Sequence, residues 1–434
     1  MRGLFGLAAA TIAAFVTGSL ARPLVVKPGS VNDIVITEIN TVNSTTKAQL
    51  QGSQGSNPLQ LEIVNNFGSN QMYLYVTGSD KNGAACMVGA DGNFFYPDAG
   101  GSATPVAING DVRIPLGGMG STTTINIPDY LISSRIWVSE GELQFFTLLN
   151  AANGLTAIVE PSVSNPEDPS ATIKWGFVEF NWNDGSIYAN ISYVDWVGMS
   201  MGMALTLATN ETQTVQGLAA GAVQNICNDL KTQNSKDNAG WDKLCMTNAN
   251  GEALRVLSPN LYIASNPSWQ SDYYTDYIDQ VWTKYASEDL TINTQSGSGS
   301  VACRVSDDQL SCANDNRSYP KPTLADIYGC NSGPFAIADG DNDVHRAVVP
   351  RLCAAFYRST LLLDGGNVQP SLPASSYYTV DPTSHYSRVV HNYEDDNRGY
   401  AFSYDDVNPD GENAAGTVSG SSPTLLRVTA GGWS

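Results

Sequence analysis

Histidine and reactive-site motifs are scarce in this sequence, and their scarcity excludes several kinds of active site. The 434 residues include only three histidines, His345, His385 and His391, and none is spaced from another as a pair of metal ligands. No Cys-x-x-Cys pair occurs, and no Gly-x-Ser-x-Gly elbow stands between a strand and a helix. These absences argue against a metal centre and a serine hydrolase, and no motif predicts a cofactor.

Basic residues are also few. Lys and Arg number 22 against 42 Asp and Glu, which gives a formal net charge of −20. Such a chain repels the phosphates of nucleic acids and of anionic membranes, and no basic patch offsets this. A neutral polysaccharide is indifferent to that charge. We therefore expect no nucleic-acid or membrane partner, and a monomer.

Long apolar runs are missing after the first twenty residues. Residues 1–21 have the pattern of a secretory signal peptide, with Arg2 before a short apolar stretch and Ser19-Leu20-Ala21 at the cleavage site. The stretch is too short for a convincing membrane span, although an uncleaved anchor is the alternative. The sequence therefore predicts a secreted, extracellular protein. Four Asn-x-Ser/Thr sequons predict a glycoprotein, at Asn43, Asn190, Asn210 and Asn316.

Cysteines are present but unevenly placed. Six of the seven lie between residues 227 and 353, and an oxidising compartment would pair them. Six cysteines allow 15 pairings, of which local pairing is the simplest: Cys227–Cys245, Cys303–Cys312 and Cys330–Cys353. Cys86 remains, in an apolar context typical of a buried structural thiol.

The periodicity of the chain changes twice. Short alternating runs of β type recur up to residue 204, and spacing of helical type follows at 214–231, 268–286 and 341–363, where Pro350 should kink or divide the helix. Strand patterns return later, as in 399–407 and 425–429. We expect a mainly β protein with an α/β insertion: a β-sandwich or barrel (22–204 and 361–434) carrying a mixed α/β lobe with the disulfides (205–360), and an open groove between the two.

Two carboxylates sixteen residues apart, Glu179 and Asp195, lie in runs rich in aromatic and β-branched residues. A pair of carboxyls on a rigid sheet can cleave a glycosidic bond, because one protonates the leaving oxygen while the other attacks or activates water. The alternative is two ordinary strands whose acids face solvent. Asp184 is the rival base, although an Asp-Gly turn explains it fully. The acidic stretch 394–396 is interpreted as a solvated loop.

Several motifs resemble a known family. Val178-Glu179-Phe180, Ile191–Asp195 and Gly399–Asp406 resemble the acidic-cleft and closing segments of thaumatin-like proteins, and 345–356 together with 175–195 resembles glycoside hydrolase family 64, the β-1,3-glucanases on a thaumatin-like barrel with a mixed α/β domain. The resemblance spans roughly residues 30–434, but the chain lacks most thaumatin-like cysteines.

The resemblance implies inverting, endo-acting cleavage of β-1,3-glucan, with Glu179 as general acid and Asp195 as general base. It implies sugar contacts from Asn181, Asn183 and Tyr188, and the neighbouring Trp182 is a further candidate. A thaumatin-like glucan-binding protein with little or no catalysis is the alternative.

Strand geometry tests this assignment. Glu179, Asn181 and Asn183 share one face of their strand, since side chains alternate along a strand. Asn190 and Asp195 are an odd number of residues apart, so a glycan at Asn190 should lie on the face opposite to Asp195 and leave the groove clear. A tight turn at 183–185 pairs Glu179 with residue 190 or 191, which leaves Asp195 roughly 15 Å away along a flat strand. Inversion needs about 6.5–9.5 Å between the carboxyls. A bulge, twist or bend must therefore bring Asp195 back.

Overall fold

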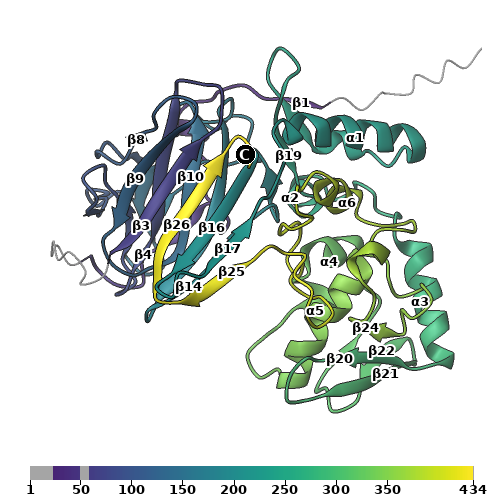
Figure 1. Cartoon of the computed structure of the whole chain (residues 1–434). Coiled ribbons are helices and arrows are strands. Elements are labelled where there is room, and N and C mark those ends of the chain that lie inside the picture. The colour runs from purple at the N-terminus through teal and green to yellow at the C-terminus, as the bar shows by residue number, and fades with distance from the viewer. Residues whose placement is uncertain (1–22, 49–57, 434) are drawn as a thin grey trace, which may run out of the picture.

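The computed structural model describes residues 23–48 and 58–433, so the expected signal peptide lies outside the described residues. A β-sandwich and a set of helices with small sheets lie side by side (Figure 1). Among the described residues, none of the helices is both long and apolar enough to cross a membrane.

The sandwich is built from an eight-stranded and a five-stranded sheet. The larger sheet contains, in spatial order, β25 (Val418–Ser421), β14 (Ser186–Ile191), β13 (Lys174–Asn183), β10 (Leu131–Glu140), β4 (Met72–Asp80), β5 (Ala85–Val88) and β6 (Phe94–Phe95), with β8 (Ile114–Pro115) beside β4. The smaller sheet contains β17 (Thr212–Val215), β16 (Met201–Leu207), β26 (Pro423–Ala430), β3 (Leu59–Asn65) and β9 (Ser121–Ile127). Apolar side chains from both sheets, such as Leu61, Val76, Phe180 and Val428, are buried together in one core.

The outer face of the large sheet is divided between an aromatic cluster and an open stretch. Trp137 of β10 and Trp175 and Phe177 of β13 are buried in a second core, to which Trp196 and Met246 also belong. Because side chains alternate along a strand, the next residue of β13 on this face is Glu179. The buried aromatic residues thus hold the first half of β13 in place, and the second half of the strand carries polar residues on the same face.

Three small sheets complete the structure. The first contains, in spatial order, β2 (Thr41–Asn43), β12 (Thr156–Val159), β11 (Phe146–Leu149) and β7 (Val106–Ala107). The second contains β1 (Leu24–Val25), β18 (Cys245–Thr247), β19 (Ala253–Leu257) and β15 (Trp196–Val197). The third contains β23 (Ser318–Tyr319), β22 (Gln309–Cys312), β21 (Ser300–Ser306), β20 (Leu290–Asn293) and β24 (Val368–Gln369). The α-helices are α1 (Ala222–Asp237), α2 (Pro259–Ser265), α3 (Thr275–Ser287), α4 (Leu324–Gly329), α5 (Asp343–Tyr357) and α6 (His385–Asn392). Short 3₁₀ turns lie at Val31–Asp33, Trp241–Leu244, Gly333–Phe335 and Ala374–Ser376.

The helical part begins and ends later than the sequence predicts. Residues 201–207 and 212–215 pair within the smaller sheet, so the chain leaves the sandwich after Val215 and not at residue 205. It returns at Val418 and not at 361, because α6 and the loops after it intervene. Near the N-terminus of the described chain, residues 34–37 follow the 3₁₀ turn Val31–Asp33 without regular secondary structure.

The expected helix boundaries also shift. α1 starts at Ala222, after Gly217 and Gly221 with positive φ, and α3 starts at Thr275. α5 runs undivided through Pro350. Its buried residues Val348, Leu352 and Phe356 and the Cys330–Cys353 bridge hold the helix on both sides of the proline.

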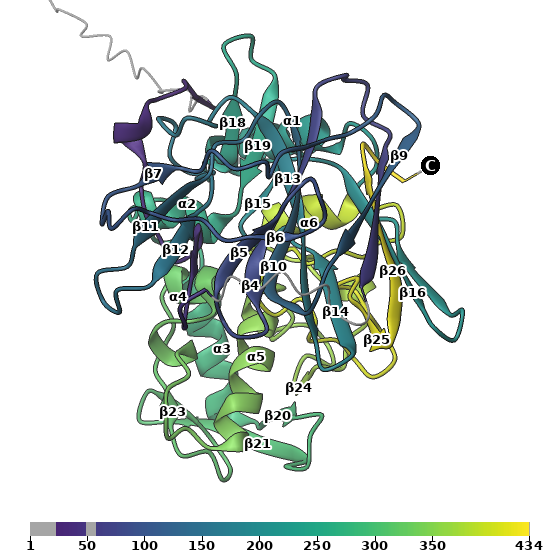
Figure 2. The ribbon, with the colours of Figure 1, turned by 90° about the vertical axis from the view of Figure 1, so that its left-hand side faces the viewer.

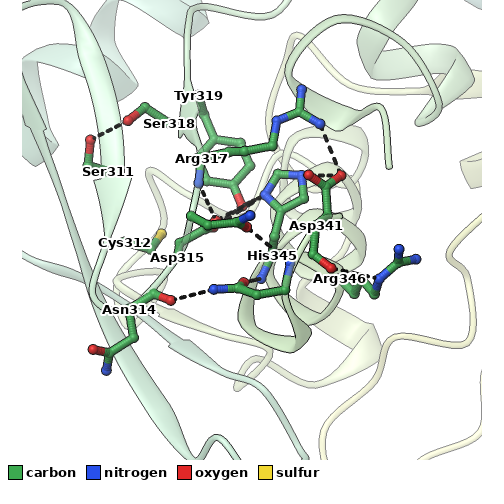
Figure 3. Close-up of polar contacts among 12 residues, drawn as sticks. Ser311, Cys312, Asn314, Asp315, Arg317, Ser318, Tyr319, Asp341, His345 and Arg346 are labelled. Carbon is green, nitrogen blue, oxygen red and sulfur yellow. Dashed lines mark hydrogen bonds and ion pairs between the residues drawn. The ribbon is translucent and has the colours of Figure 1, made fainter. Parts of the chain in front are cut away.

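Disulfides and a buried polar cluster stabilise the lobe. The three bridges are Cys227–Cys245, Cys303–Cys312 and Cys330–Cys353, as local pairing predicts, and Cys86 is free and buried. Near the start of α5, His345 Nδ1 lies 2.9 Å from the Tyr319 hydroxyl and 3.2 Å from Asp315 Oδ1 (Figure 3). Tyr319 also donates to Asp315, so this cluster joins α5 to β23.

The segment 394–407 is not the solvated loop and strand that the sequence predicts. Glu394 is buried and accepts a 2.7 Å contact from His391 Nδ1, while His391 Nε2 lies 2.9 Å from Asp405 Oδ2. Asp405 also accepts from the Ala401 amide and from Arg358. The buried carboxylate therefore folds 401–405 into turns, although the sequence alternates.

Candidate functional site

The β13–β14 hairpin presents the first acid. Glu179 pairs with Asn190, and Asn183 pairs with Ser186, with Asp184-Gly185 as a two-residue turn. Both turn residues have positive φ (49° and 76°), as a type I′ turn requires. The register confirms the expected pairing, and Asp184 is an exposed turn residue.

A bend presents the second acid. β14 ends at Ile191, the next residue forms an isolated bridge with Tyr400, and the chain bends at Val194 and Asp195. The Asp195 carbonyl accepts from the Ser258 amide at 2.8 Å, and the ring of Trp196 packs on Phe177 at 4.8 Å. The strand is therefore not a flat continuation of the hairpin, and this bend turns Asp195 back toward Glu179.

Glu179 and Asp195 line the same cleft, whose volume is about 680 Å³. Its walls come from five parts of the chain: the large sheet (Ser79, Ser133, Ser134, Arg135, Glu179, Phe180, Asn181, Tyr188 and Asn190), the residue after β12 (Glu160), the bend (Ser192, Val194 and Asp195), a C-terminal loop (Tyr400 and Ser403), and the N-terminal segment (Glu38, Ile39, Thr41, Val42 and Asn43). The lining is predominantly polar and contains several hydroxyl and amide groups. Such a surface can form many hydrogen bonds to a hydroxyl-rich ligand.

One guanidinium organises the charges of the cleft. Arg135 Nη1 lies 2.6 Å from Glu160 Oε2, and its Nε and Nη2 each lie 3.3 Å from Glu179 Oε1. Glu160 is buried, and its other oxygen accepts from Thr77 at 2.6 Å. Both contacts to Glu179 use the same oxygen, so Arg135 leaves Oε2 of that carboxyl for a ligand.

The carboxyl of Asp195 holds its proton unusually strongly. Burial, reinforced by the negative charge of Glu179 and opposed by Arg135, raises the pKa of Asp195 from 3.8 to about 6. Burial likewise raises the pKa of Glu160 despite its bond to Arg135. Asp195 therefore changes its charge in the range where an acid or base catalyst is useful.

The candidate sugar contacts are divided among different environments. Asn181 and Tyr188 line the cleft, with Tyr188 40% exposed. Trp182 is only 2% exposed and packs edge-on against Tyr130 in the sandwich core, so it points away from the cleft and is not available to a ligand. Asn183 is exposed at the end of the hairpin, outside the cleft lining.

The expected position of Asn190 is wrong. Residues paired across two strands share a face, so Asn190 lies on the same face as Glu179, and it lines the cleft with 8% exposure. Parity along the strand does not relate Asn190 to Asp195, because the strand ends at Ile191. Asn43, Asn210 and Asn316 are exposed.

The sequence interpretation missed Arg135, Glu160, Tyr400 and the N-terminal segment. Arg135 carried a signal, since Arg135 and Trp137 share one face of a strand whose other face carries Ile136 and Val138. Glu160 follows an apolar strand directly and carried no such signal. Tyr400 lies in the predicted strand 399–407, but in the structure it reaches the cleft from an isolated bridge with Ser192.

Comparisons with known proteins agree with this architecture. The family model described as β-1,3-glucanase of glycoside hydrolase family 64 matches residues 57–430. Glucan endo-1,3-β-glucosidases from Arthrobacter sp. (strain YCWD3) and Cellulosimicrobium cellulans are each 26% identical over 355 residues, which cover 80% of this chain and 61% of each relative. The chain thus spans about three-fifths of the length of these curated relatives.

Two solved structures match over nearly their whole length. A laminaripentaose-producing β-1,3-glucanase in complex with laminaritetraose is 28% identical with a TM-score of 0.75, and the match covers 86% of this chain and 98% of that one. A glucanase domain from Clostridium beijerinckii has the same fold, with 20% identity and a TM-score of 0.66 over 88% of this chain and all of that one. Since the family model covers most of the sequence, the chain belongs to the β-1,3-glucanases of glycoside hydrolase family 64.

Proposed function

We propose that this protein is a secreted, endo-acting β-1,3-glucanase that hydrolyses β-1,3-glucan with inversion of the anomeric centre. The observation that carries the proposal is the pair Glu179 and Asp195, presented by a hairpin and the bend after it to one polar cleft. Family membership and the neighbour named for its complex with laminaritetraose supply the substrate class. Three disulfides support an oxidising, extracellular setting.

The proposed reaction needs one proton donor and one proton acceptor. Glu179 gives its proton to the glycosidic oxygen as the bond to the anomeric carbon breaks. Asp195 takes a proton from the water whose oxygen forms the new bond on the opposite face of the sugar. Because Asp195 ionises at about pH 6, we expect activity to fall as the pH drops through that value, in a profile of initial rate on soluble β-1,3-glucan.

A reducing-end assay tests the function. We expect wild-type protein to cleave linear β-1,3-glucan, and Glu179→Gln and Asp195→Asn each to lower kcat by on the order of 10²–10⁴. Asp184→Asn is the matched control, since it removes a carboxylate from the same hairpin at an exposed turn that Asn also tolerates. A wild-type protein that binds the glucan but releases no reducing ends would instead support a glucan-binding protein. NMR of early products should show α-configured reducing ends, and β-configured ends appearing first would contradict inversion.

The reverse roles, with Asp195 as acid and Glu179 as base, have one observation in their favour. Asp195 has a raised pKa, whereas Glu179 contacts Arg135. An aryl β-glycoside of a laminari-oligosaccharide with a good leaving group distinguishes the two assignments of acid and base. Such a leaving group departs without protonation, so its release does not depend on the general acid. We expect Glu179→Gln to retain most of its activity on this substrate, and Asp195→Asn to be rescued by azide as an α-glycosyl azide. The opposite pattern would exchange the roles.

A further inference from the structure

The N-terminal segment precedes the residues that the family model matches, and it borders the cleft. The family model matches residues 57–430. Residues 38–43 precede that match, and all but Asn40 line the cleft that contains Glu179 and Asp195. Part of the cleft wall therefore comes from residues that precede those matched by the family model.

The segment is held in place by many hydrogen bonds. β2 pairs with β12, from Asn43 opposite Ala157 to Thr41 opposite Val159. Asn40 is 5% exposed, and its Nδ2 donates to the carbonyls of Val35 (2.9 Å) and Glu160 (3.1 Å). The Glu160 amide donates back to the Asn40 carbonyl at 2.8 Å. The segment is thus a fixed part of the cleft and not a loose tail, and Figure 2 shows it beside β12.

Its position defines one end of the cleft. The carbonyl of Ile39 accepts from Arg135 Nη1 at 2.8 Å, and the same guanidinium contacts Glu179. Across the large sheet the order is β14, β13, β10, β4, so Tyr188 lies on one side of Glu179 and Arg135 on the other. Two strand spacings of about 4.8 Å separate β13 from β4. A glucan lying across these strands would extend from Tyr188, over Glu179, to the N-terminal segment.

We propose that residues 38–43 form a glucan-binding subsite that sets the preference of this protein for substrate length. The inference rests on the proposed function of the same cleft. The exposed carboxylate of Glu38 can accept hydrogen bonds from sugar hydroxyls, and the partly buried side chains of Ile39 and Val42 offer apolar surface to a ring face. This subsite contacts only oligosaccharides long enough to reach it from the cleavage point.

Substitution of one exposed residue tests the subsite without disturbing the core. Glu38→Trp places a large side chain in the cleft wall, and Val35→Trp is the matched control, since Val35 is 49% exposed in the same segment but does not line the cleft. Both variants are made in wild-type and in Glu179→Gln protein, in a bacterial periplasm where Asn43 carries no glycan. Thermal melts of both check that folding is unchanged.

Two readouts decide the outcome. In Glu179→Gln protein, calorimetric titration with β-1,3-linked oligosaccharides of increasing length should show that Glu38→Trp weakens binding of the longer members about 5–20-fold, or roughly 1–2 kcal/mol, and leaves the shortest unchanged. In active protein the same substitution should shift the lengths of products from linear glucan, while Val35→Trp changes neither readout. Equal behaviour of Glu38→Trp and Val35→Trp would overturn the subsite while the glucanase stands. A wild type that neither binds nor cleaves these sugars would overturn the proposed function, and the subsite with it.

Discussion

Two groups of charged residues lie near the cleft, and they differ in how completely their charges are matched. In the cleft one cation, Arg135, faces three carboxyls, Glu160, Glu179 and Asp195. Behind the cleft wall two cations face two carboxyls, and the members of this second group are Arg358, His391, Glu394 and Asp405.

The difference separates a reactive arrangement from a structural one. Asp405 accepts from Arg358 at 2.8 Å, from His391 at 2.9 Å and from the Ala401 amide at 2.8 Å. Burial disfavours its charge, but His391 and Arg358 outweigh burial and hold the pKa of Asp405 below its usual value. Asp195 receives no comparable set of partners, and its pKa rises. A buried carboxyl with few cations and hydrogen-bond donors around it can exchange a proton near neutral pH. A carboxyl whose charge is balanced by such partners stays ionised and holds the surrounding chain in place.

The largest expected effect is the loss of a matched charge. Asp405→Asn leaves Arg358 and His391 without their shared carboxylate in a buried site, so we expect unfolding to become easier by about 3–5 kcal/mol. Urea denaturation at pH 7 measures this free energy. A loss below about 1 kcal/mol would show that the second group is not structural.

Alkaline pH should weaken the same group. Burial lowers the pKa of His391, but Glu394 and Asp405 outweigh burial and raise the pKa to about 10. The folded state therefore holds a proton that the unfolded state releases near pH 6.5, so this stabilisation is complete below pH 6.5 and disappears as the pH rises through about 10. Melting temperatures measured from pH 6.5 to 10 should fall for wild type. The His391→Gln protein should melt lower at pH 6.5 and show a flatter dependence.

Asp195→Asn should have the opposite effect on stability. The pKa of Asp195 is about 6 when folded and about 3.9 when unfolded, so its ionised form destabilises the protein above pH 6 and not below about pH 4. The amide removes that charge, and we expect a gain of about 1–3 kcal/mol at pH 8 that vanishes near pH 4. Asp184→Asn should change stability at neither pH. A destabilised Asp195→Asn protein at pH 8 would contradict the contrast between the two groups.

The smallest effect concerns a neutral cleft residue. Tyr188→Ala removes a 40% exposed ring from the cleft, so we expect about 1 kcal/mol weaker binding of β-1,3-linked oligosaccharides and a smaller loss of kcat than either acid variant shows. Tyr188→Phe keeps the ring and should bind nearly as wild type. Equal losses for both variants would assign the contact to the hydroxyl group and not to stacking.

Local patterns predicted much of this molecule, and distant contacts account for what they missed. The turn at Asp184-Gly185 fixed the register of Glu179, and the requirement for a bend before Asp195 followed from strand geometry alone. Trp182 was misplaced because an aromatic residue beside an acid suggests a sugar contact, although its parity assigns it to the core. Arg135 and the N-terminal segment could not be found in this way, since the segment meets Glu160 across 120 residues of chain.

The order of strands in the smaller sheet has a consequence for synthesis. β26, close to the C-terminal end of the chain, occupies the central position between β16 and β3, and Arg427 contacts Glu62 across 365 residues. Until β26 leaves the ribosome, β3 and β16 each lack a neighbour and present an unpaired edge. Such edges invite pairing with other chains, and contacts of this sequence separation form slowly. The sandwich therefore closes only after the chain has been translated beyond β26, and a nascent chain paused before residue 423 should require a chaperone to remain soluble.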